Sequence, residues 1–206
     1  MVAADPRKDS LNPIDRLVNL SDAVISIAVT LLILPLVDKA SAINVTSWSG
    51  LTHATGQQFF IFLISFVVIC RLWLVHHWLF RSIEKFNRPL FWLNTFWLLT
   101  IVIIPFPTEL IGRTSDTSSI ILGLYIGTLL VNALTSFALQ WYVRRSPYLR
   151  KKQSGNTSLA LPAATVILML LALVVSTTIP SVGPWSLLLL VASDRLGTVL
   201  QKKTGL

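Results

Sequence analysis

Long apolar runs, separated by short polar segments, divide this chain into six hydrophobic windows. A membrane-spanning helix needs roughly 20 mainly apolar residues, and windows of that length occur at about 17–37, 57–80, 90–111, 118–142, 159–179 and 183–201. Residues 1–12 are polar and form a separate tail that ends before Pro13. The pattern predicts an all-α integral membrane protein with six transmembrane helices in one domain, residues 13–206.

Composition supports the membrane class. Hydrophobic residues make up 53% of the 206 positions and charged residues 13%, and the mean hydropathy is +0.70. The net charge of +8 does not predict a nucleic-acid partner, because the basic residues lie at the ends of the apolar windows. They are better explained as topology signals and as contacts to anionic membrane lipids. Cys70 is the only cysteine, which excludes an internal disulfide.

The distribution of basic residues predicts the orientation in the membrane. Connections on the cytoplasmic side retain Lys and Arg. Fourteen of the 17 lie in the N-terminal region, the 81–88 turn, the 144–152 loop and the C-terminal end: Arg7, Lys8, Arg16, Arg81, Lys85, Arg88, Arg144, Arg145, Arg150, Lys151, Lys152, Arg195, Lys202 and Lys203. The opposite connections hold only Lys39 and Arg113, and Arg71 lies within a window. Both termini should therefore be cytoplasmic, and the number of spans should be even.

Two connections carry structural signals of their own. The long outer connection is rich in Ser, Thr, Gly and Ala, and we expect a short interfacial helix around Trp48. Pro105 and Pro107 are expected to break the end of the third helix, because proline removes a backbone donor.

The first window has two opposed faces. Each residue of an α-helix advances by 100°, so Ile27, Leu31 and Leu34 fall on one narrow stripe. Asp22 lies about 140° from Ile27 on the same helix. The carboxylate and the aliphatic stripe therefore point in nearly opposite directions.

Asp22 allows two interpretations. It could be a proton or cation site, or it could accept hydrogen bonds in a buried polar network, which is the interpretation we favour. Such a network could form near the cytoplasmic side, because polar groups buried among helices must satisfy one another. The candidates are Arg16, Ser21, Asp22, Asn94 and one of His76 and His77. We expect no metal site, since adjacent histidines point about 100° apart and no further ligand stands at suitable spacing.

The segment "RLVNLSD", residues 16–22, resembles the R-x-x-x-F-S-D signature of the transmembrane-protein-175 family of potassium channels, with Leu20 where the family has Phe. The similarity continues through "SDAVISIAVTLLILPL", "HHWLFRSIEKFNRPLFWLN" and "LLTIVIIPFPTELIG". It covers the first three windows well and the last three only in hydropathy. From the residues alone, the aliphatic stripe would be a lipid-facing or packing surface, so the resemblance changes its interpretation.

The resemblance implies a homotetramer of six-helix subunits in a bacterial plasma membrane, with the first helix lining a central pore for K⁺. Animal lysosomal members instead fuse two six-helix units. The family's constricting position falls on Ile27, the next lining positions on Leu31 and Leu34, and a nearby hydroxyl on Thr30. The polar network would then set whether the ring is tight or open. No cofactor beyond the permeant ion is implied, and no T-V-G-Y-G filter occurs in this chain.

Three other functions are considered. A proton-coupled secondary transporter could use Asp22 and an intramembrane histidine, but the helix breaks lie at helix ends and not in mid-membrane. An intramembrane enzyme is not expected, because neither H-E-x-x-H nor G-x-S-x-G is present. A non-conducting assembly protein is the third alternative.

Overall fold

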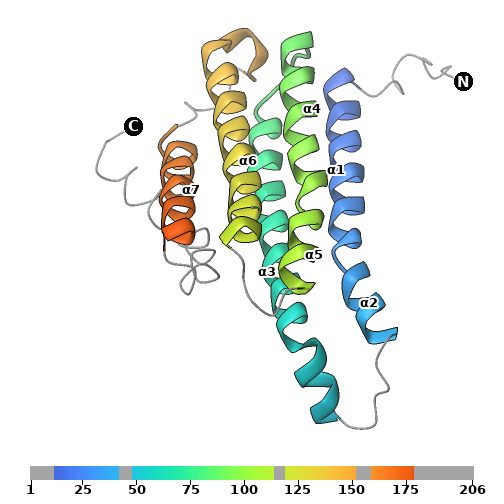
Figure 1. Cartoon of the computed structure of the whole chain (residues 1–206). Helices are drawn as coiled ribbons and strands as arrows, with labels where there is room; N and C mark the ends of the chain where they lie inside the picture. The colour runs from blue at the N-terminus through green and yellow to red at the C-terminus, as the bar shows by residue number, and fades with distance from the viewer. Residues whose placement is uncertain (1–11, 42–47, 114–118, 152–158, 179–206) are drawn as a thin grey trace, which may run out of the picture.

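The chain folds into long helices that run alternately up and down (Figure 1). The computed structural model describes residues 12–41, 48–113, 119–151 and 159–178. In order, the elements of this part of the chain are α1 (Pro13–Leu31), α2 (Leu34–Ser41), α3 (Trp48–Arg81), α4 (Arg88–Ile103), α5 (Pro105–Arg113), α6 (Ser119–Arg145), a 3-10 turn η1 (Pro147–Leu149) and α7 (Ala160–Thr178).

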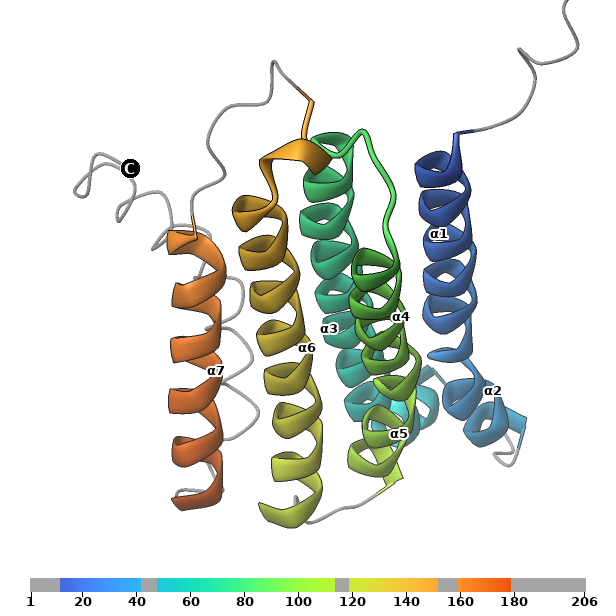
Figure 2. The same cartoon turned by 90° about the horizontal axis from the view of Figure 1, so that it is seen from above.

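The helices form a slab in which α1 with α2 and α7 occupy opposite edges (Figures 1 and 2). Helix α4 packs against both α1 and α6, and α6 packs against α7. One large apolar core joins α1, α3, α4, α6 and α7, and a second core lies nearer the N-terminal end of α1, built from Ile14, Leu17, Leu79, Phe80, Ile83, Leu90, Leu139, Val143 and Leu149. Helix α1 therefore contributes one face to both cores.

Four segments of the described chain are long and apolar enough to cross a membrane: Pro13–Lys39, Thr55–Arg81, Arg88–Gly112 and Ser119–Arg145. A shorter apolar helix, Ala160–Ser176, lies in the fifth predicted window. The sixth window, 183–201, falls outside the described residues. The prediction of an all-helical membrane protein is confirmed for the described chain, whereas the count of six spans stays a prediction.

Proline interrupts two of these spans. Leu32 and Ile33 separate α1 from α2, and the amides of both bond to carbonyls three residues back, at 3.3 Å. Pro35 explains the break, because it has no amide to offer the carbonyl of Leu31 and its ring crowds the preceding turn. Leu34 therefore begins a second helix, so the prediction that it continues the ideal spacing of α1 is wrong.

The prediction of a separate interfacial helix around Trp48 is also wrong. Residues 48–81 form one continuous helix, α3, that begins at Trp48 and ends at Arg81. The segment contains no proline, so nothing in its backbone chemistry forces a break. At the second proline site, Pro105 interrupts the span at Ile104, and the chain then continues as α5.

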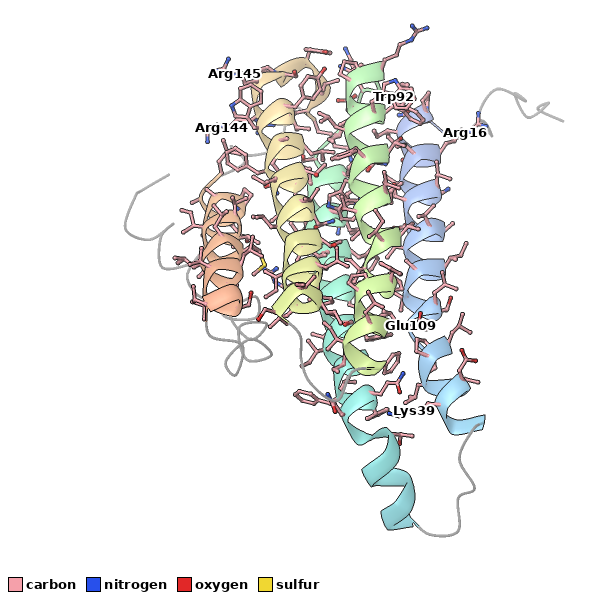
Figure 3. The ribbon with its side chains drawn as sticks, in the orientation of Figure 1. Arg16, Lys39, Trp92, Glu109, Arg144 and Arg145 are labelled. Carbon is pink, nitrogen blue, oxygen red and sulfur yellow. The ribbon has the colours of Figure 1, made fainter. Side chains whose placement is uncertain are left out.

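Basic side chains gather at one end of the slab. Figure 3 shows Arg16, Arg144 and Arg145 at the same end, while Lys39 and Glu109 lie towards the other. At the basic end, the two connections of the described chain bind each other through the backbone. The amide of Glu84 donates to the carbonyl of Leu149 at 2.7 Å, and that of Lys151 donates to Ser82 at 2.9 Å. This end is therefore held as one unit.

Candidate functional site

Helix α1 buries one face and leaves the opposite face uncovered. The residues it buries are Ile14, Leu17, Ser21, Ile25 and Ala28. On the other side, Ile27 is 60% exposed, Leu31 39% and Leu34, at the start of α2, 51%. Three large aliphatic side chains thus remain partly exposed on one side of the chain.

A directed chain of hydrogen bonds fixes the buried face. Asn94 on α4 donates from Nδ2 to the hydroxyl of Ser21 at 2.9 Å, and Ser21 donates to the carbonyl of Leu17 at 2.9 Å. The amide oxygen of Asn94 lies 2.6 Å from Nε2 of His76. A carbonyl oxygen can only accept, so Nε2 carries the proton. The chain therefore runs from His76 through Asn94 and Ser21 into the backbone of α1.

Burial makes this chain costly to break. Ser21 and Asn94 have no exposed surface, and His76 is 5% exposed. The imidazole lies between two aromatic rings, with centroids 4.3 Å from Phe80 and 4.1 Å from Trp97. Of the two candidate histidines, the structure brings His76 and not His77 into the chain.

Asp22 has a different partner. Its carboxylate accepts from the indole Nε1 of Trp73 on α3 at 2.7 Å. The ring of Trp73 lies 5.4 Å from that of His77, which is half-buried and whose Nδ1 makes no hydrogen bond. Asp22 therefore ties α1 to α3, next to the bond chain that ties α1 to α4.

Sequence reasoning missed Trp73. It lies three residues before His76 and four before His77, a spacing that places all three on neighbouring parts of one helix face. That spacing was the available signal, because an indole carries a donor that a buried carboxylate can use.

Arg16 does not join the polar network, which corrects its predicted place there. Its side chain is exposed, and in Figure 3 it extends away from the helices at the basic end. Within the described residues, no hydrogen bond or ion pair links it to Ser21, Asp22 or Asn94. Arginine has a long side chain that loses solvation when buried, and this one keeps its hydration instead.

The uncovered face also carries hydroxyl groups. Thr30 donates to the carbonyl of Ile27 at 2.8 Å, and Ser26 donates to that of Asp22 at 2.8 Å. Each hydroxyl therefore already donates its proton, and its oxygen lone pairs remain available to a cation. Among the described residues, no group of three or more His, Cys, Asp or Glu side chains could hold a metal ion.

A groove of about 330 Å³ runs between α1 and α3 beside this face. Its walls are formed by Asp22, Ile25, Ser26, Val29, Cys70 and Trp73. A half-buried carboxylate in a membrane-spanning segment is unfavourable against lipid. Its bond to Trp73 lowers that cost.

Comparison with known proteins identifies the family. A sequence profile described as "Endosomal/lysosomal potassium channel TMEM175" matches residues 16–105. A protein of Streptomyces collinus, named a potassium channel, is 32% identical over 146 residues, which cover 68% of each chain. This chain belongs to the TMEM175 family.

Other TMEM175 relatives extend the comparison. A rat protein named "Endosomal/lysosomal proton channel TMEM175" is 25% identical over 121 residues, covering 59% of this chain and 24% of its own. The crystal structure of a lysosomal potassium-selective channel TMEM175 homolog from Chamaesiphon minutus superposes with a TM-score of 0.70 at 21% identity, covering 89% of this chain and 97% of that one. That likeness shows the fold. These relatives and structural neighbours are ion channels and not enzymes.

Replacing Asn94 tests the bond chain. We expect Asn94→Ala to lower the stability of the folded state by about 2–4 kcal/mol, because it leaves the buried imidazole N–H of His76 without an acceptor and removes the donor to the Ser21 hydroxyl oxygen. Thermal unfolding of the detergent-purified protein measures the change. The matched control is Asn19→Ala on the exposed side of α1, and equal melting temperatures for the two variants would contradict the role of the chain.

Proposed function

We propose that this protein is a modestly potassium-selective cation channel, assembled as a homotetramer in a bacterial plasma membrane, with α1 lining a central pore. The observation that carries the proposal is the exposed stripe of Ile27, Leu31 and Leu34 on a helix whose other face is fixed by buried polar bonds. Family membership supports it, since several relatives are named potassium channels. The basic end of the slab is placed in the cytoplasm on the positive-inside rule.

Selectivity in this proposal comes from dehydration. Four copies of Ile27 form the narrowest ring, and Leu31 and Leu34 line the pore beyond it. A hydrophobic ring conducts only when it is wide enough to remain wet. K⁺ sheds hydration water more readily than Na⁺, so a ring that forces partial dehydration favours K⁺ without coordinating carbonyls. Thr30, beside the ring, offers a hydroxyl oxygen to an ion in transit.

The polar contacts of α1 set the shape of the ring. Ser21 and Asp22 hold α1 against α4 and α3 through Asn94 and Trp73. A rotation of α1 by one residue's spacing would turn the stripe by about 100°. The bonds therefore keep Ile27 directed at the axis, and a change in them opens or narrows the pore.

A proton-coupled transporter is the alternative. It would use Asp22 and an intramembrane histidine. The engagement of Asp22 by Trp73 and of His76 by Asn94 favours a bracing role instead. Saturating flux that requires a proton gradient would support the transporter, whereas discrete single-channel currents support the channel.

Ile27→Asn tests the constriction. An amide in the ring hydrates readily, so we expect a higher conductance and a lower K⁺-to-Na⁺ permeability ratio in planar bilayers. Ile167→Asn provides a matched control, because Ile167 on α7 is 57% exposed and lies on another helix. Unchanged conductance and permeability ratio in Ile27→Asn would refute the Ile27 ring.

Asp22→Asn tests the brace between α1 and α3. The amide is a weaker acceptor for the Trp73 indole than the carboxylate, so we expect a changed open probability and a less stable tetramer. Single-channel recording and size-exclusion chromatography measure the two effects. Asp15→Asn, at an exposed position in the first turn of α1, is the control. An Asp22→Asn channel with unaltered assembly and gating would argue against any bracing role.

A further inference from the structure

Arg16 lies at the basic end of α1, where its exposed side chain leaves the bundle (Figure 3). Nothing in the polar network explains it, since Ser21, Asn94 and His76 form their chain without it. We therefore consider where Arg16 lies relative to the exposed stripe of α1.

Helical spacing puts Arg16 on the same stripe as Ile27. The two residues are 11 positions apart, so their side chains point in directions that differ by about 20° around the helix axis. They are separated by about 16 Å along that axis. Leu20 and Ala23 fall on the same face between them, and both are exposed. Arg16 thus extends the uncovered face to the basic end of α1.

Arg16 is also the only charge of α1 that lies within 100° of Ile27 on the helix. The other charged residues between positions 13 and 31 are Asp15 and Asp22, which point about 100° and 120° away from Arg16. No carboxylate on the stripe offsets the guanidinium. Asp15 is exposed in the same turn, but a pore lined by the Ile27 stripe would place the Arg16 guanidinium nearer its axis than the Asp15 carboxylate, so the positive charge dominates at the mouth.

We propose that the Arg16 side chains form a positively charged ring at the N-terminal mouth of the pore, which depletes cations there and makes K⁺ conduction asymmetric. The inference rests on the proposed pore-lining role of α1. At the opposite end, α2 carries Asp38 and Lys39, whose charges are of opposite sign, so ions that approach from that side meet no net positive ring before the Ile27 constriction. At low salt, current carried from the Arg16 side is therefore smaller than current in the reverse direction.

The size of the effect follows from the surface potential. A potential of about one to two kT at the mouth lowers the local K⁺ concentration roughly three- to sevenfold. Screening limits this range, because the Debye length is about 10 Å at 0.1 M salt and about 3 Å at 1 M. The asymmetry should be strong in dilute KCl and weak in concentrated KCl.

Single-channel recording in symmetric KCl tests the ring. We expect the full-length channel to show a roughly threefold or greater ratio of currents at opposite voltages in dilute KCl, and a ratio near one at about 1 M. Arg16→Gln should abolish the ratio in dilute salt and leave the K⁺-to-Na⁺ permeability ratio unchanged. The larger current is divided by the smaller one for each single channel, so the result does not depend on the orientation in which that channel inserts into the bilayer.

Two controls make the result specific. Arg16→Lys keeps the charge and should keep the asymmetry, and Arg145→Gln removes an exposed charge at the same end of the slab but on α6 and should have no effect. A wild-type channel with symmetric currents in dilute salt, or an Arg16→Gln channel with the wild-type ratio, would overturn the proposal. If Ile27→Asn alters permeation and Arg16→Gln does not, the Arg16 ring is wrong and the proposed pore stands. If neither substitution alters permeation, the proposal that α1 lines the pore is wrong as well.

Discussion

The orientation of α1 depends on the hydrogen-bond chain that joins His76, Asn94 and Ser21. Within an apolar environment these groups have no water to bond, so each must find a protein partner. Only one rotation of α1 presents Ser21 to Asn94. That rotation also brings Asp22 to Trp73 and turns Ile27 away from the other helices of the chain. The exposed stripe is thus a consequence of where the polar groups are satisfied.

In the proposed channel, the groups that hold α1 in place are separate from the side chains that line the pore. Polar and aromatic groups, which make directional bonds, lie between helices and fix their positions. The aliphatic side chains on the far face make no directional bonds and are free to form a surface whose width alone matters. The proposed pore needs a rigid backbone behind its lining, and Ser21 and Asp22 hold α1 through contacts with two different helices.

Much of this could be predicted from the sequence. Window lengths predict a helical membrane protein, and the 100° spacing by itself separates Asp22 from Ile27. Other features depend on contacts between helices, which spacing on one helix cannot supply. The pairing of Asp22 with Trp73 and the choice of His76 over His77 are of this kind. Contacts between helices also decide that Arg16 lies outside the network. Its direction on α1, about 120° from Asp22, could have been calculated from the sequence. Pro35 was visible in the sequence, and its lost hydrogen bond could have predicted the break before Leu34.

The proposed pore requires that the Ile27 stripe face a water-filled cation path while the opposite face of α1 packs against protein. Single cysteines at positions 27, 31 and 34, in a Cys70→Ser background, test this most directly, with cysteines at positions 25 and 28 on the buried face for comparison. Silver ions react with thiols and can enter wherever K⁺ passes. We predict that silver rapidly blocks the currents of the first three variants and spares the other two. Currents through variants 27, 31 and 34 that persist in silver, with block at 25 or 28, would contradict the pore-lining role of the stripe.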